Sequence, residues 1–208
     1  MAERTRALNR LHGLLRDLLP GGVAGKLSAD RAARILRGIR ARGGASARLR
    51  RRLASEVLRV VRTLDRKIAD LNVRVEAEVE ASGSTLTQIF GVGPILAATI
   101  LGAVGSVARF PTKAHFASYA GTAPVEASSG EVVRHRLSLA GNRHLNYALH
   151  MVAVCQARSD ARGGTYYRKK IAEGKSRKEA LRCLKRRISD AVFKSLIADL
   201  QAPSSSAA

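Results

Sequence analysis

Apolar residues recur at three- and four-residue spacing over most of this chain, a pattern typical of amphipathic α-helices. In segment 3–19, four leucines fall on one helical face: Leu8, Leu11, Leu15 and Leu18. The Pro-Gly-Gly run at 20–22 ends this helix. Ser28 is positioned to cap a second helix, which stops at the Gly-Gly pair 43–44.

Segment 46–81 contains neither Gly nor Pro and predicts one long helix. At 1.5 Å per residue, such a helix is about 50 Å long. Its apolar positions follow repeated steps of four, four and three residues: Leu49, Leu53, Val57, Val60, Leu64, Ile68, Leu71, Val75 and Val79. This eleven-residue period gives a nearly straight seam, so we expect a helical hairpin or a two-helix coil.

The pattern changes after Gly83 to shorter segments typical of a compact domain. We expect short helices at 85–89 and 112–119, apolar helices at 94–103 and 142–158, and two basic helices that complete the domain. Ser176 and Glu179 have capping-box spacing for the last helix. The predicted fold is therefore mainly α. A helical, coiled-coil-like arm at 1–82 precedes a compact helical domain at 83–200 and a disordered tail at 201–208.

The turn Gly91-Val92-Gly93 is followed by Pro94 and an Ala-rich helix. Glycine permits a sharp turn and a close approach of backbone to phosphate, and the amides of the following helix face the anion. Pro94 suits the first helical position. The pattern favours a helix-hairpin-helix that binds the nucleic-acid backbone without reading sequence. The alternative is a plain turn that packs two helices closely.

The charge balance points to a polyanionic partner. The chain has 208 residues, with 37 Lys+Arg against 16 Asp+Glu and a formal net charge of +21. A hydrophobic content of 46% supports a real core. Nucleic acid is the commonest polyanion that binds such a surface. A membrane surface is disfavoured because only 4% of residues are aromatic and none is Trp.

No signal peptide is visible, and the longest apolar run, 95–104, is too short to span a bilayer. We therefore expect a cytoplasmic protein. The excess of Arg over Lys indicates a bacterial source, where we expect association with the nucleoid. Cys155 and Cys183 lie far apart in helical patterns, which predicts neither a zinc pair nor a redox pair.

Two stretches concentrate the positive charge. Segment 1–66 has 17 basic residues against 5 acidic ones, and segment 158–187 has 12 against 3. The second stretch supplies further candidate phosphate ligands: Arg168, Lys169, Lys170, Arg186 and Arg187. Tyr166 and Tyr167 are candidates either for stacking on unpaired bases or for anchoring the core.

A polar turn at Ser128-Ser129-Gly130 is a candidate for nucleophilic chemistry. A serine that attacks a phosphodiester needs nearby cations to hold the phosphate and stabilise transition-state charge. Candidate cations follow closely: Arg134, His135, Arg136, Arg143 and His144. No carboxylate is placed to complete a catalytic triad. From composition alone, an ordinary polar turn is the stronger interpretation.

Four ordered blocks together resemble a known family: GVGPILAATILGAVG, RFPTKAHFASYAGTAPVEASSG, RHRLSLAGNRHLNYALH and YYRKKIAEGKSRKEALRCLKRR. They resemble the DEDD-type insertion-sequence transposases, which include Piv-like DNA invertases and bridge-RNA-guided recombinases. The resemblance covers nearly the whole chain. It likens 84–200 to the family's C-terminal transposase domain and 3–82 to its helical linker.

The resemblance implies a nucleophilic serine at Ser129, with Ser128 as the second candidate. It implies transposition or site-specific recombination of DNA, a structured guide RNA, and homo-oligomers formed through the helical arm. It also implies Mg²⁺ bound by four acidic residues of an N-terminal RNase H-like domain, which has no counterpart in these residues. The run Glu76, Glu78 and Glu80 cannot replace that domain, because two-residue spacing on a helix does not face one point.

Two functions thus stay open, and a third is weaker. The chain is either a transposase fragment that needs a separate metal-binding domain, itself holding no cofactor, or a non-catalytic nucleic-acid-binding regulator or relic. A ribosome-type structural RNA-binding protein fits the charge but leaves the ordered glycine and serine motifs unexplained.

Overall fold

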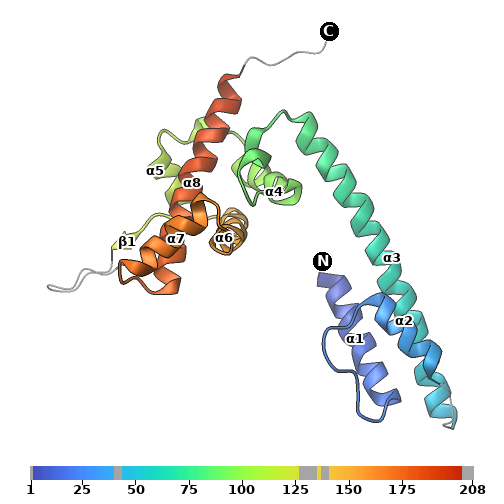
Figure 1. Ribbon diagram of the computed structural model, residues 1–208. Helices are drawn as coiled ribbons and strands as arrows, with labels where there is room; N and C mark the ends of the chain where they lie inside the picture. Colours follow the sequence, from blue (N-terminus) through green and yellow to red (C-terminus); the bar gives the residue numbers. More distant parts are fainter. Residues whose placement is uncertain (1, 40–43, 127–134, 137–140, 203–208) are drawn as a thin grey trace. The chain divides into compact units, whose positions relative to one another are not determined.

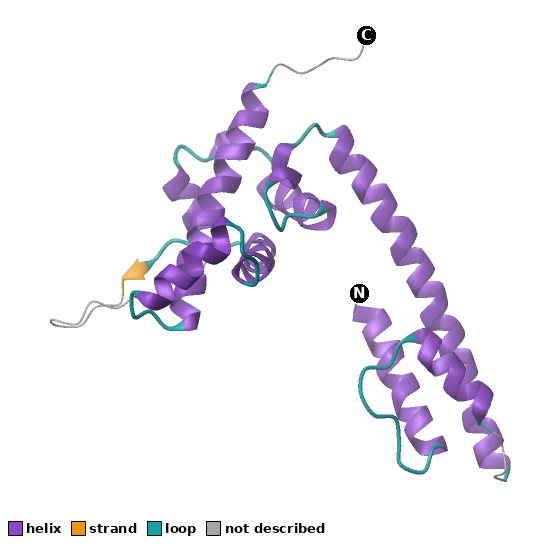
Figure 2. Ribbon diagram, viewed as in Figure 1, coloured by secondary structure: helices purple, strands orange, loops and turns teal. Residues whose placement is uncertain are grey.

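The computed structural model describes residues 2–39, 44–126, 135–136 and 141–202. These ranges are mainly helical, as predicted (Figures 1 and 2). The α-helices are α1 (Ala2–Leu18), α2 (Ala29–Gly38), α3 (Ala45–Ala81), α4 (Pro94–Val104), α5 (Lys113–Tyr119), α6 (Arg143–Ala157), α7 (Arg162–Ala172) and α8 (Arg177–Gln201). Short 3-10 turns are η1 (Thr85–Gln88) and η2 (Val107–Arg109), and two-residue strands are β1 (Val125–Glu126) and β2 (His135–Arg136).

The chain forms two compact units, Met1–Arg74 and Val75–Ala208. In the first unit, α1 and α2 form a small core with the start of α3. Its buried residues are Leu11, Leu15, Ala29, Ala32, Leu36, Ala54, Leu58 and Val61. The Ser28 hydroxyl accepts a hydrogen bond from the amide of Arg31, which confirms the predicted cap of α2. Such a cap stabilises a helix by about 1 kcal/mol.

The structure confirms the long helix α3. However, the apolar residues of α3 that are fully buried in the first unit are not those of the predicted eleven-residue period. Ala54, Leu58 and Val61 are the covered positions, each one residue after a predicted seam residue. Because successive residues are rotated by about 100° on a helix, the two stripes lie side by side. Four predicted seam residues stay exposed: Leu49, Leu53, Val60 and Leu71. The helix therefore carries two apolar stripes. The first unit buries the stripe that contains Ala54, whereas the predicted seam packs only in part, at Val57, Val75 and Val79.

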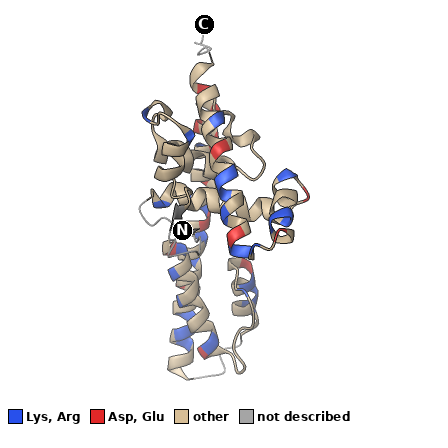
Figure 3. Cartoon of the chain, turned by 90° about the vertical axis from the view of Figure 1, so that its left-hand side faces the viewer, with Lys and Arg blue, Asp and Glu red and all other residues tan. Residues whose placement is uncertain are grey.

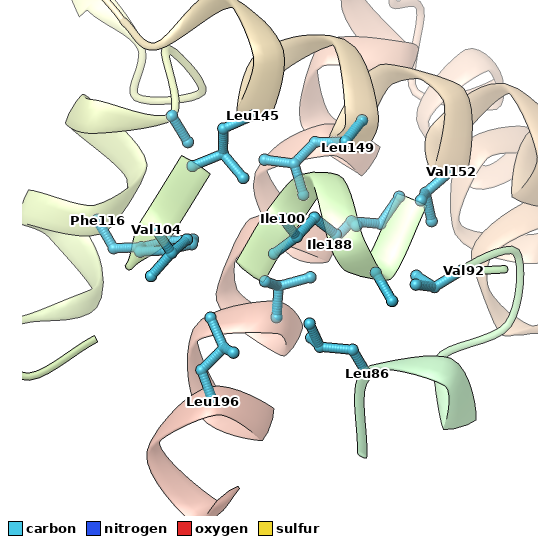
Figure 4. Close-up of a cluster of buried hydrophobic side chains, with 14 of the residues drawn as sticks. Leu86, Val92, Ile100, Val104, Phe116, Leu145, Leu149, Val152, Ile188 and Leu196 are labelled. Carbon is cyan, nitrogen blue, oxygen red and sulfur yellow. The ribbon is translucent and has the colours of Figure 1, made fainter. Parts of the chain in front are cut away.

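The second unit is built around α6 and α8. Its buried core joins residues from α4, α5, α6 and α8, including Ile100, Phe116, Leu149 and Ile188 (Figure 4). The Phe116 ring lies edge-on to the Phe110 ring, with centroids 5.3 Å apart. The turn that precedes α4 packs against α6, because a Cβ on Gly91 would lie 3.4 Å from Cys155 Cβ.

Local capping chemistry sets several helix starts in this unit. Asn142 caps α6, and Ser176 with Glu179 forms the predicted capping box of α8. Thr112 lies just outside α5 and caps it, so this helix starts one residue later than predicted. The segment expected as a short helix at 85–89 is the 3-10 turn η1, since four residues are too few for a stable α-helix. Within the described ranges, no helix combines the length and apolar character needed to cross a membrane.

Candidate nucleic-acid interface

The glycine turn connects η1 to α4. Gly91 has φ +88°, a left-handed conformation that favours glycine, while the side chain of Val92 is buried in the core. Gly93 is the N-cap of α4 and Pro94 occupies the first turn. Gly93 supplies no side-chain cap, and the amides of Ile95 and Leu96 have no acceptor within the helix. The turn thus presents backbone donors at the positive end of a helix dipole.

A buried glutamine holds this turn in place. Gln156 of α6 is 9% exposed, and its Nε2 donates to the carbonyl oxygen of Phe90 at 2.7 Å. Gly163 of α7 leaves room for that side chain, because a Cβ there would lie 2.2 Å from Gln156 Oε1. Sequence patterns gave no signal for Gln156, since its partner lies 66 residues away along the chain.

A second set of hydrogen bonds holds the start of η1 in place. The Asp199 carboxylate accepts hydrogen bonds from Ser84 Oγ at 2.9 Å, from the Thr85 amide at 3.0 Å and from Thr85 Oγ1 at 2.6 Å. Asp199 therefore ties the segment before the turn to the end of α8. In this position the carboxylate has a structural role.

The candidate nucleophiles Ser128 and Ser129 lie outside the described residues, as does Arg134. The strands on either side of them are described. β1 and β2 pair antiparallel, with Val125 opposite Arg136 and Glu126 opposite His135. We call residues 122–140 the serine segment. The pairing of β1 with β2 brings its two described strands side by side.

The base of the serine segment is held tightly. A Cβ on Gly141 would lie 2.4 Å from the Gly121 nitrogen, so the backbones at these glycines touch. The Asn142 amide donates to the Tyr119 carbonyl at 2.7 Å. Asn146 Nδ2 donates to the carbonyls of Ala120 and Gly121 at 2.8 and 3.1 Å. The residues that flank the segment 122–140, at 119–121 and 141–142, are thus fixed to each other and to α6.

A buried lysine completes this base. Lys185 of α8 is 7% exposed, and its Nζ donates to Asn146 Oδ1 at 2.9 Å. Burial lowers the pKa of the Lys185 ammonium. Burial and the Lys185 charge also lower the pKa of His150, in that order of importance. The buried Lys185 ammonium is therefore hydrogen-bonded to the Asn146 side-chain amide, a pairing that sequence patterns did not single out.

The predicted cations divide into exposed and paired groups. Figure 3 shows where Lys and Arg lie along the helices. Arg143 and His144 are exposed in the first turn of α6, near the base of the serine segment. On α7, Lys169 is exposed, while Arg168 lies 3.3 Å from the Asp160 carboxylate. Arg136 lies in β2.

The other three predicted cations interact within α7 and α8. Lys170 pairs with Glu173 at 2.5 Å and Arg186 with Asp190 at 3.2 Å. The Arg187 guanidinium lies 5.5 Å from the Tyr166 ring centroid. These three cations already have partners within the chain. Arg143, in the first turn of α6, is therefore more available to a phosphate than they are.

Tyr166 and Tyr167 are partly buried against the core of the second unit. The Lys170 ammonium, like Arg187, lies 5.5 Å from the Tyr166 ring centroid. This arrangement matches the core-anchor alternative for both tyrosines. The strongly exposed aromatic residues of the described chain are instead Phe90 and Tyr147.

No group of three His, Cys, Asp or Glu side chains able to hold a metal ion occurs among the described residues. Cys155 is exposed and Cys183 half-buried, and both are free thiols.

The region that contains the glycine turn and α6 is similar to a known transposase family. Residues 83–168 match the model of a family described as "Transposase IS116/IS110/IS902 family". The matched segment begins just before η1 and ends in α7, so it contains the glycine turn, the serine segment and α6.

Curated insertion-element proteins are similar over a longer stretch. The chain is 36% identical over 126 residues to the IS110 uncharacterized 43.6 kDa protein of Streptomyces coelicolor, a match that covers 60% of this chain and 31% of the relative. It is 32% identical over 131 residues to the IS900 uncharacterized 42 kDa protein of Mycobacterium paratuberculosis, covering 61% and 33%. The IS116 protein of Streptomyces clavuligerus is 29% identical over 133 residues, covering 62% and 33%. The chain thus spans about a third of the length of these relatives.

Proposed function

We propose that this chain is the DNA-binding C-terminal part of an insertion-sequence transposase of the DEDD type, acting in DNA transposition or site-specific recombination. The observation that carries the proposal is the position of the family match. The matched segment 83–168 contains a helix-start turn with free amides and the exposed cations of α6. The net charge of +21 supports the same partner.

DNA binding is tested by fluorescence anisotropy on labelled duplex at increasing salt. Counterion release makes the logarithm of the affinity fall linearly with the logarithm of salt concentration. Replacing Arg143 by Gln should lower the affinity for every duplex sequence and make that slope shallower by about one phosphate contact. Lys178→Gln, on an exposed turn of α8, serves as the charge-matched control. Salt-independent binding, or none at low salt, would contradict the proposal.

Catalysis in this proposal uses Ser129 as nucleophile, with Ser128 as the second candidate. The serine oxygen attacks a phosphodiester phosphorus, a serine–phosphate bond forms, and the departing sugar oxygen takes up a proton. Arg134, Arg136 and Arg143 supply positive charge for the phosphate, and His144 supplies a further hydrogen-bond donor. Mg²⁺ would be bound by a separate RNase H-like domain, and a guide RNA would be the second nucleic acid.

The serine assignment is tested in a chimera. The matched segment of the Streptomyces coelicolor relative is replaced by that of this chain, and excision of a marked insertion element is followed. We expect Ser129→Ala to abolish excision and Ser128→Ala to leave it. The reverse pattern would transfer the role to Ser128, and excision by the double variant would end the proposal for this turn.

The alternative function is a non-catalytic nucleic-acid-binding regulator or relic. It is favoured by the lack of a metal-binding group among the residues the structure describes. We expect the purified chain with Mg²⁺ to bind DNA without cleaving it. Cleavage by this chain alone would refute both the alternative and the need for a separate metal domain.

Self-association through α3 is part of the proposal. Leu49, Leu53, Val60 and Leu71 form an exposed apolar stripe on this helix, with exposed fractions between 41% and 55%. A second copy of the helix would cover such a stripe. Leu53→Glu should lower the mass measured by sedimentation equilibrium, whereas Arg52→Glu beside the stripe should not. A wild-type chain that is monomeric at all concentrations would exclude this contact.

A further inference from the structure

The outward side of α6 carries a row of large apolar side chains. Tyr147 is 60% exposed, Met151 is 38% exposed, and Cys155 is also exposed. These residues are four apart, so each lies about 6 Å further along the same side of the helix. The opposite side of α6 supplies Leu145, Leu149 and Val152 to the core (Figure 4). The row is therefore not needed for packing of this unit.

The row continues onto the glycine turn. A Cβ on Gly91 would lie 3.4 Å from both Cβ and Sγ of Cys155, so the turn touches the end of the row. Gln156 fixes the carbonyl of Phe90 at this point. Phe90 is 54% exposed and Ile95, in the first turn of α4, is 45% exposed. We call Tyr147, Met151, Cys155, Phe90 and Ile95 the aromatic row.

Exposed arginines flank the aromatic row on α6. Arg143 precedes it in the first turn of the helix, and Arg158 follows it. Neither η1, α4 nor α6 contains an Asp or Glu. An apolar strip between cations, with no acid on its elements, complements a ligand that combines flat apolar groups with phosphates.

We propose that the aromatic row binds the unpaired bases of a nucleic-acid strand. The rings of Tyr147 and Phe90 stack on bases, while Arg143 and Arg158 hold phosphates on either side. A fully paired duplex offers phosphates to the cations but keeps its base faces stacked, so it leaves the row uncovered. This inference rests on the proposed nucleic-acid binding and names its substrate class, a strand with unpaired bases.

The test compares affinities for three probes by fluorescence anisotropy: a single-stranded DNA without secondary structure, its duplex, and a single-stranded RNA of the same sequence. Base–aromatic stacking predicts a loss of about tenfold in single-strand affinity for Tyr147→Ala or Phe90→Ala. Duplex affinity should change by less than about twofold. Tyr147→Phe should retain single-strand affinity because the ring remains. Ile171→Ala, an exposed aliphatic truncation on α7, is the matched control.

The outcomes separate this inference from the proposed function. A loss in either the DNA or the RNA single-strand arm, with the duplex unaffected, supports stacking and identifies the strand. Equal losses on all probes, no loss on any, or full affinity in Tyr147→Leu overturn the row as a base-stacking surface while nucleic-acid binding stands. A wild-type chain that binds none of the probes overturns the proposed function, and this inference with it.

Discussion

Two alanine substitutions, one in the glycine turn and one inside α4, should change stability in opposite directions. Gly91 has φ +88°, and an L-residue in a left-handed conformation costs about 1–2 kcal/mol. Alanine also lowers the conformational entropy of the unfolded chain, which offsets about 0.4–1 kcal/mol of that cost. The new methyl would lie 3.4 Å from Cys155 Cβ, a close contact that adds little. Gly91→Ala should therefore lower the free energy of unfolding by about 1 kcal/mol.

Gly102 is the matched control because it lies inside α4 with helical backbone. A Cβ there would have no heavy atom within 4 Å. Replacing glycine by alanine inside a helix stabilises it by about 0.5–1 kcal/mol. The same chemical change, eleven residues further along the chain, should thus raise the free energy of unfolding.

The assay is urea unfolding of the full chain followed by tyrosine fluorescence. The four tyrosines all lie in the second unit, and the chain has no Trp, so this signal reports the unit that contains both glycines. The expected difference between the variants is about 1.5–2 kcal/mol. A Gly91→Ala variant as stable as wild type, or a destabilised Gly102→Ala variant, would refute the assigned backbone conformations.

Three further substitutions test the contacts around the site. Gly141→Ala should lower the free energy of unfolding by about 1–3 kcal/mol, because its Cβ would lie 2.4 Å from the Gly121 nitrogen; an unchanged urea midpoint would exclude that contact. Asp199→Asn should lower the free energy of unfolding by about 2 kcal/mol, because a neutral amide oxygen accepts the hydrogen bonds from Ser84 and Thr85 more weakly. Asp160→Asn, on the surface, should lower it by less than about 1 kcal/mol. Equal urea midpoints for the two variants would argue against the structural role of Asp199. Burial lowers the pKa of Lys185, so the unfolded state binds this proton more tightly, and the free energy of unfolding of the wild type should rise as pH increases from the lowered folded pKa toward 10.5. The Lys185→Met variant should lack this rise, and the Lys178→Met variant should keep it. A Lys185→Met profile parallel to that of the wild type would contradict the burial of the charge.

Local signals in the sequence determined most helices of this protein. Apolar spacing and the absence of Gly and Pro located α3 within one residue of its observed start. The cap at Ser28 and the capping box at Ser176 also follow from residues three positions apart. Helix formation and capping depend on neighbours within one or two turns, so the sequence pattern alone carries them.

Only the tertiary structure decided which surfaces these helices bury. On α3 the sequence offers two adjacent apolar stripes, and packing with α1 and α2 covers the one that contains Ala54. The hydrogen bonds of Gln156 with Phe90 and of Lys185 with Asn146 join residues 66 and 39 positions apart. Periodicity does not encode such pairings, because they depend on which elements meet in space. For the same reason, the folded chain, and not its composition, distinguishes the core-packed Tyr166 from the exposed Tyr147.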